Sequence, residues 1–263
     1  MSEFSAIGDL FERNANSAYE LLEFDRFVLE HVVGGLGALA DELEANLNHN
    51  AAQTVRRRGE ALETVNQNAS LRPRYRTIYN QCVVLLVSYF GSAVHSLFLK
   101  GVAVGLRGTV LLPVVRQEVK LTWSDLAAQP DTSAELFAAL LVAQRDISFQ
   151  DMQSIKRAFE DHLGLLIHKT EDVNDLILGQ AARHVIVHSG SVVDAKMVRQ
   201  VSGAAPRQLK PVVVEGEPLS FSPDEVKALG RSMTRYIKEL ISRLGELMAQ
   251  AGTGVVPSAT DTE

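Results

Sequence analysis

The sequence has little cysteine, which limits its covalent and redox chemistry. Cys82 is the only cysteine among 263 residues, so no disulfide can form within one chain. It begins the apolar run 82–87, where a buried small hydrophobic side chain is the usual role of cysteine. We therefore expect Cys82 in the core and not as a catalytic thiol.

The chain also lacks an excess of positive charge. Its formal net charge is -6 and its pI is about 5.7, which argues against a protein held to nucleic acid by its global charge. Any contact with RNA or DNA must be local. The first residues lack both a basic segment and a continuous apolar run, so we expect no secretory signal and a cytoplasmic protein. The sequence contains no phosphate-binding glycine loop and no internal repeat.

Hydrophobic residues make up 46% of the chain, enough for a real core. Their spacing predicts a mostly α-helical protein in three parts: an N-terminal helical arm at 1–70, a helical domain at 71–250 and a disordered tail at 251–263.

Apolar residues recur every three or four positions between residues 7 and 47, as in an amphipathic helix. Gly34, Gly35 and Gly37 interrupt this pattern, and glycine costs about 1 kcal/mol relative to alanine inside a helix. We therefore expect a bend or a break there. The segment could be a core helix of the same domain or an arm for dimerisation or partner binding.

Two arginine clusters follow the arm. The first spans residues 56–58 on an expected helix, and the second comprises Arg72, Arg74 and Arg76 at the start of the next helix. Helix starts favour anions, so the second cluster is a candidate RNA or phosphate site. A solvated helix face is the alternative, because consecutive helical arginines point in different directions.

Residues 77–99 carry no formal charge and are long enough to cross a membrane. They include Asn80, Gln81 and His95, which would be costly in lipid without partners. We therefore favour a buried central helix and no membrane association.

The remaining chain predicts short connecting strands between helices. Residues 118–123 alternate polar and apolar side chains, as in a strand. Residues 212–214 and 218–221 flank the turn pair Glu215 and Gly216, a pattern that favours a small β-hairpin.

Helix boundaries carry clearer signals. Hydroxyl and carboxylate residues at the spacing of a capping box, together with a glycine stop, predict several ends. These residues are Thr132 with Glu135, Ser148 with Asp151, Gly164 as a stop, Thr170 before an acidic first turn, and Ser222 with Glu225 around Pro223.

An arginine and two histidines lie within six residues of an aliphatic segment, near the end of the helix that begins around Thr170. At about 100° per residue, His184 and His188 share one stripe and Arg183 flanks it. An arginine can bind phosphate in two places, and a histidine can move protons. The three side chains could therefore split an RNA phosphodiester with the neighbouring 2′-hydroxyl as nucleophile, without a metal or other cofactor.

Two other interpretations of this cluster remain open. Both histidines could be core residues bonded to backbone, with Arg183 in an ion pair. Alternatively, the histidines could share a zinc ion, although residues 185–187 lack the catalytic glutamate of zinc proteases and no third ligand is evident.

Arg183, four residues and then His188 at a helix end resemble the Arg-to-His signature of the HEPN superfamily (higher eukaryotes and prokaryotes nucleotide-binding), in which a polar residue such as His184 follows the arginine. The apolar helix at 79–99, the sequence at 189–194 and the last helix from Ser222 are also similar to bacterial HEPN proteins. The resemblance covers roughly residues 72–249 and leaves the arm unexplained.

The resemblance implies an up-and-down helical bundle that forms a homodimer, with the two motifs facing each other. It also implies a metal-independent endoribonuclease of antiviral defence or of a toxin–antitoxin system. Arg183 would then steady the scissile phosphate, His188 would transfer protons and His184 would orient them or contact RNA. An antitoxin or another defence protein is an implied partner. A module that binds nucleotide, RNA or a protein without cutting is the alternative.

Two positions depart from the family pattern. Gly190 stands where some toxin members carry a tyrosine that their antitoxin modifies, which argues against that mode of control. The apolar helix has Gly91 and His95 where some members place an acidic residue facing the motif.

Overall fold

The computed structural model describes residues 4–68, 75–107, 112–122 and 134–252. Those residues are mostly helical, as expected, and contain no strand. The elements are α1 (Ser5–Ala45), α2 (His49–Gln67), α3 (Tyr75–Arg107), the short 3-10 helix η2 (Pro113–Arg116), α5 (Ala134–Gln144), α6 (Met152–Leu163), α7 (Glu171–His188), α8 (Ala195–Ser202) and α9 (Pro223–Gly252).

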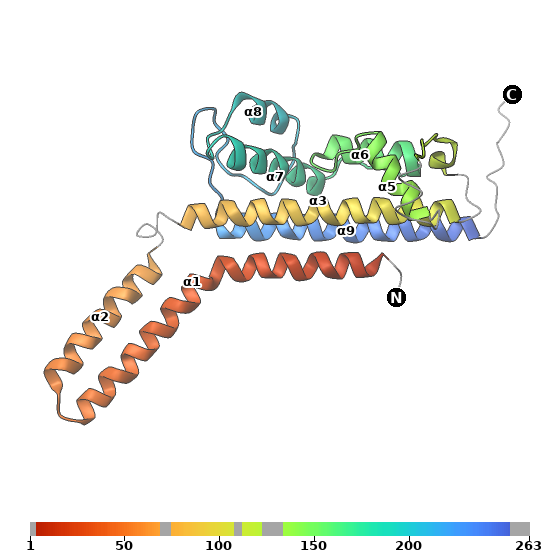
Figure 1. Ribbon diagram of the computed structural model, residues 1–263. Helices are drawn as coiled ribbons and strands as arrows, with labels where there is room; N and C mark the ends of the chain where they lie inside the picture. Colours follow the sequence, from red (N-terminus) through yellow and green to blue (C-terminus); the bar gives the residue numbers. More distant parts are fainter. Residues whose placement is uncertain (1–3, 69–74, 108–111, 123–133, 253–263) are drawn as a thin grey trace.

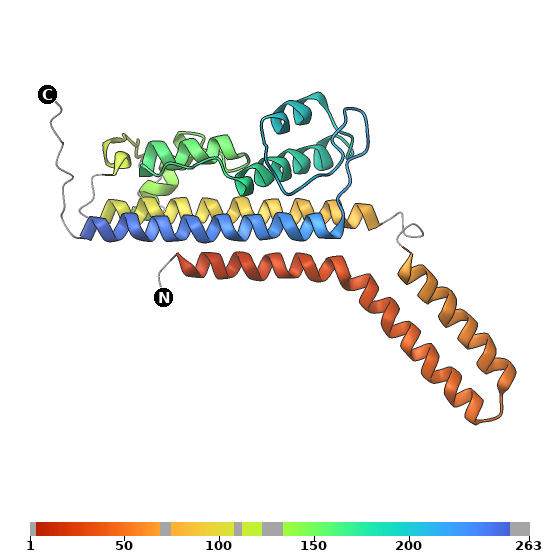
Figure 2. The same ribbon diagram turned by 180° about the vertical axis from the view of Figure 1, so that it is seen from behind.

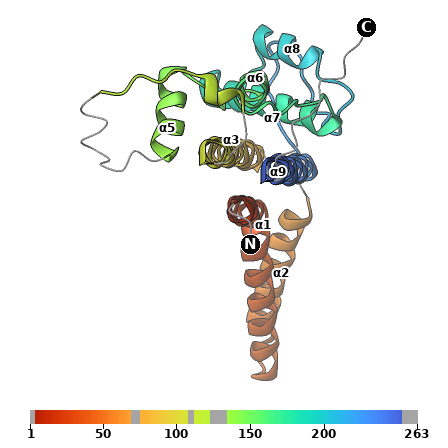
Figure 3. The same ribbon diagram turned by 90° about the vertical axis from the view of Figure 1, so that its right-hand side faces the viewer.

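The helices α3 and α9 lie side by side at the centre, with α1 on one side and α5, α6 and α7 on the other (Figures 1 and 3). Seen from behind, the second half of α1 projects away from this body together with α2 (Figure 2). α3 and α9 run in the same direction, whereas α1 and α7 run opposite to them (Figure 1). The chain therefore alternates in direction through α1, α3, α7 and α9.

Contacts along α1 and α9 show their antiparallel packing residue by residue. Glu12 pairs with Lys238 at 2.8 Å, and Glu23 further along α1 pairs with Lys227. Between these pairs, Tyr19 lies so close to Gly230 that a Cβ there would stand 1.8 Å from the tyrosine Oη. Any larger residue at this crossing would force the Tyr19 ring out of its position between the two helices.

α3 is the buried central helix that its apolar sequence predicts. Cys82 is fully buried, as expected, and its Sγ lies 3.5 Å from the carbonyl oxygen of Ala18. Burial raises the pKa of this thiol to about 11. The helix Thr77–Arg107 is long and apolar enough to cross a membrane. Half of its most apolar stretch is buried inside the protein.

α1 passes without a break through the three glycines where we expected a bend or break. That expectation of a break is wrong, because α2 packs along this half of the helix and supports it. Ala40 and Ala52 are fully buried, and Arg56 bonds to both Asp41 and Glu44. The change of direction in Figure 1 accompanies the departure of α1 from α3 and α9.

The two interpretations of this segment apply to different halves of α1. Phe11 and Leu22 in the first half belong to the core. Beyond them, Phe24 and Phe27 are 63% and 60% exposed. The first half of α1 is thus a core helix, and its second half forms a projecting helical hairpin with α2.

The strand expected at 118–123 is wrong for the residues that the structure describes, 118–122. Instead of pairing with another strand, Lys120 bonds through its backbone N–H, at 2.9 Å, and its carbonyl, at 2.5 Å, to the side-chain amide of Gln144. Trp123 lies outside the described residues.

The β-hairpin expected at 212–221 is also wrong, although its turn at Glu215 and Gly216 is present. The second half pairs with the segment that follows α7: Val192 and Pro218 form a single bridge, and the Leu219 N–H donates to the Ser191 carbonyl at 2.7 Å. A partner distant in sequence therefore replaces the local one.

Helix ends follow the sequence signals closely. Ser222 and Glu225 form the expected capping box at α9, and Gly164 ends α6 in the left-handed conformation. One start is corrected: Asp151, not Ser148, caps α6 by accepting from the Ser154 N–H. Thr132 and residues 253–263 lie outside the described residues, and α9 itself continues to Gly252.

Candidate functional site

α7 begins and ends where its sequence predicts. Thr170 caps the helix by accepting from the Val173 N–H at 3.2 Å, and the acidic Glu171 and Asp172 occupy the first turn, where the helix dipole favours negative charge. The helix ends at His188, followed by Gly190 with φ +59°. The structure therefore confirms that Arg183, His184 and His188 lie in the last turns of one helix.

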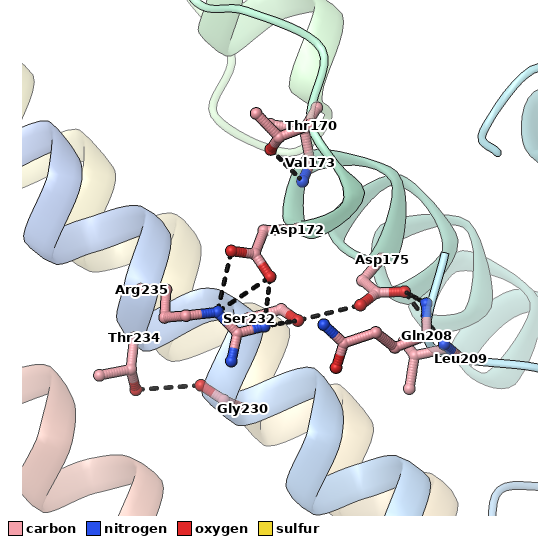
Figure 4. A network of polar contacts seen from close by, with 10 residues as sticks. All are labelled: Thr170, Asp172, Val173, Asp175, Gln208, Leu209, Gly230, Ser232, Thr234 and Arg235. Atoms are coloured by element: carbon pink, nitrogen blue, oxygen red, sulfur yellow. Dashed lines mark hydrogen bonds and ion pairs between the residues drawn. The ribbon is translucent and has the colours of Figure 1, made fainter. Parts of the chain in front are cut away.

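Polar contacts fix the start of α7 against α9 (Figure 4). Asp172 forms a two-point ion pair with Arg235, and the fully buried Asp175 accepts from the Ser232 hydroxyl at 2.9 Å. Asp175 also accepts from the backbone N–H groups of Gln208 and Leu209. The buried carboxylate thus has three hydrogen-bond donors, as a buried charge requires, and these bonds fix the start of α7 against α9 and the segment at Gln208 and Leu209.

The three motif side chains do not converge as the helical spacing indicated. The rings of His184 and His188 lie together, with centroids 4.9 Å apart. Arg183 turns instead toward α6, where its Nη1 donates to Oε1 of Gln150 at 3.0 Å. His188 lies five positions after Arg183, which is about 140° around the helix and explains why one chain places them on different faces.

Arg183 and His184 line a cavity of about 590 Å³ between α6, α7 and α8. Its wall is polar and carries cations. Lys196 from α8 joins Arg183, while the lining carboxylate of Asp151 is already bonded to the N–H and hydroxyl of Ser154. His188 is exposed at the helix end and is not part of the lining. Four glutamines complete the polar wall: Gln150, Gln153, Gln180 and Gln200.

Sequence reasoning missed Gln150 and Gln180. Gln180 is a polar residue in the buried middle of α7, between Gly179 and Ala181, and this position was the available signal. Gln150 lies just before α6 and carries no such signal in the sequence, because its hydrogen bond to Arg183 depends on how α6 packs against α7.

The second candidate cluster falls mostly outside the described residues. Arg72 and Arg74 lie there, and for Arg76 only the helical backbone of α3 is described. One turn after Arg76, Asn80 donates to the Leu219 carbonyl at 3.0 Å and lies 3.4 Å from the hydroxyl of Ser191. The start of α3 therefore lies beside the segment that follows His188.

Within the described ranges, no group of three or more histidine, cysteine, aspartate or glutamate side chains is placed to hold a metal ion. His184 and His188 are thus a pair without a third such ligand in that part of the chain.

Comparison with known proteins gives no relative for this fold or site. A scan of protein-family models, a search of curated proteins and a search of solved structures each found no match.

Proposed function

We propose that the chain is a HEPN-type endoribonuclease that cleaves RNA without a metal, in antiviral defence or a toxin–antitoxin system of the bacterial cytoplasm. The observation that supports this most is the shared cavity of Arg183 and His184, with the ring of His188 next to that of His184 at 4.9 Å between centroids. A cation for phosphate and imidazoles for protons are thus neighbours on one helix end.

The reaction needs a base, an acid and a positive charge. The RNA 2′-hydroxyl loses its proton to a base and attacks the adjacent phosphorus; the bond to the 5′-oxygen breaks, and that oxygen takes up a proton. The products are a 2′,3′-cyclic phosphate and a 5′-hydroxyl. We assign proton transfer to His188, support of the phosphate to Arg183 through charge-assisted hydrogen bonds, and orientation or RNA contact to His184.

A homodimer would complete the site. Within one chain, His188 lies outside the cavity that Arg183 lines, so a second copy is the simplest source of a histidine facing each arginine. Mixing His188→Ala with Arg183→Ala subunits should then restore part of the activity, because one of the two mixed sites keeps both groups. Failure to restore any activity would favour independent sites.

The arginines at the start of α3 extend this proposal to RNA binding. We also propose that Arg72, Arg74 and Arg76 bind RNA phosphates, because they closely precede in sequence Asn80, which contacts the segment after α7.

The test is cleavage of mixed RNA in EDTA by purified protein. We expect the wild type to cut and both His188→Ala and Arg183→Ala to lose at least 100-fold in rate, on the order of a general acid–base contribution. Arg199→Ala, an exposed arginine of α8, is the control and should cut normally. Equal cutting by the motif variants would refute the assigned roles.

One observation favours a second candidate, a HEPN-like module that binds RNA, nucleotide or a protein without cutting. The Arg183 Nη1 already has a protein partner in Gln150. Binding of RNA that persists with no product in any condition would support this module over the nuclease.

A further inference from the structure

Gln180, one turn before Arg183, is buried without a partner. It is 7% exposed, and neither its Nε2 nor its Oε1 has a hydrogen-bond partner among the described residues. A buried polar group without a partner is unusual and destabilising. Asn80 and Asn174 each leave only the amide oxygen unpaired, since their amide nitrogens donate to carbonyls. Among the described residues, Gln180 is therefore the buried side-chain amide whose nitrogen and oxygen both lack a hydrogen-bond partner.

The position of Gln180 points to a ligand and not to a packing fault. It lines the cavity that Arg183 and Lys196 also line, and the Arg183 Nε is likewise buried without a partner. The volume of about 590 Å³ is within the range of small-molecule sites.

The unpaired groups specify the chemistry of the ligand. The positive charges of Arg183 and Lys196 favour an anion, and a simple phosphate would be sufficient for them. Gln180 needs a donor for its Oε1 as well as an acceptor for its Nε2, and phosphate offers only acceptors. A nucleotide supplies the anion, the donor and the acceptor. Its base carries a donor and an acceptor side by side, a short distance from its phosphate.

We propose that Gln180 recognises the base of the RNA nucleotide whose phosphate Arg183 binds, and that it favours adenine. A glutamine amide pairs with adenine by accepting from N6 and donating to N7. The proposal rests on the RNA-binding site assigned above and adds a specificity-determining residue to it. Seating the nucleotide replaces the bond from Arg183 to Gln150 with a stronger one to phosphate.

The experiment measures binding of fluorescein-labelled A, C and U hexaribonucleotides by anisotropy, with His188→Ala as the parent so that RNA stays intact. We expect the parent to bind the A hexamer about 10-fold more tightly than the others, the discrimination typical of one bidentate base contact. Gln180→Met in this parent should remove that preference, because methionine keeps the length of the side chain and lacks both polar atoms. Gln180→Glu, which can only accept, should shift preference from A toward C.

Two controls separate recognition from folding. Gln53→Met makes the same change at an exposed glutamine of α2 outside the cavity lining and should keep the preference for A. Thermal midpoints should be unchanged or higher for Gln180→Met, since it removes an unsatisfied buried amide; a structural amide would instead lower them.

Equal affinity for the three hexamers, no binding of any of them, or a preference that survives Gln180→Met would overturn the proposal. If wild-type protein cuts no RNA while the preference depends on Gln180, the nuclease assignment fails and base recognition stands.

Discussion

Arg183 and Gln150 are joined across the contact between α6 and α7: the guanidinium Nη1 donates to the amide Oε1 at 3.0 Å. A neutral acceptor thus holds the cation that our proposal assigns to phosphate. A phosphate carries the opposite charge and can accept from the guanidinium at two points, so RNA can displace Gln150.

This contact should make the charge at position 150 control RNA affinity. In Gln150→Glu a carboxylate would hold Arg183, and we expect RNA affinity to fall about 10-fold, equivalent to about 1.4 kcal/mol. Gln150→Ala would release Arg183 and strengthen binding. Filter binding of a labelled RNA measures both changes.

Gln153→Glu is the matched control, since it adds the same charge to the same cavity at a glutamine that is not hydrogen-bonded to Arg183. An equal loss of affinity in Gln153→Glu would show a general charge effect and contradict the specific contact.

The buried carboxylate of Asp175 should be essential for stability. Asp175→Ala removes the acceptor of all three bonds and leaves the backbone N–H groups of Gln208 and Leu209 without it, so we expect the unfolding free energy to fall by about 3 kcal/mol. Ser232→Ala removes one of the three donors and should cost about 1 kcal/mol. Urea denaturation measures both. A larger loss for Ser232→Ala would contradict the central role of the carboxylate.

Adding a methyl group at Gly230, where α1 and α9 cross, should lower the stability of the protein. Gly230→Ala would place its Cβ against Tyr19, and we expect a loss of about 1 to 3 kcal/mol from overpacking. Gly245→Ala lies on the same helix with nothing within 4 Å and should gain up to about 1 kcal/mol from helix propensity. Thermal unfolding compares the two; an equal effect would exclude the steric explanation.

Stability should decline in mild acid because of His162. Burial lowers the pKa of this histidine, with a smaller contribution from Arg145 and an opposing one from Asp161. Burial lowers the pKa of His95 as well. The unfolded chain therefore takes up a proton first, so this stability is fully present above about pH 6.5 and is lost as the pH falls below it.

We expect the thermal midpoint to drop between pH 7.5 and pH 5.5 and to drop less in His162→Leu, which cannot titrate. The exposed His168→Leu serves as the control and should keep the wild-type decrease. A decrease that is unchanged in His162→Leu would rule out its contribution.

The sequence by itself determined the features that depend on neighbouring residues. The caps at Thr170 and Ser222 follow from hydrogen bonds across three residues, and the burial of Cys82 follows from its apolar run. It also placed Arg183, His184 and His188 on one helix end. The assignment of the chain to the HEPN superfamily, with its nuclease activity, stays a prediction.

Only the tertiary structure decided what each side chain meets. Helical spacing could not show that Arg183 turns to Gln150, because that bond spans two helices. It could not show that Pro218 pairs with Val192, since the partner lies beyond the local turn. Nor could it show that α2 packs along the second half of α1, or that Gln180 lacks a partner among the described residues. Contacts between distant segments settle these points, and no local propensity encodes them.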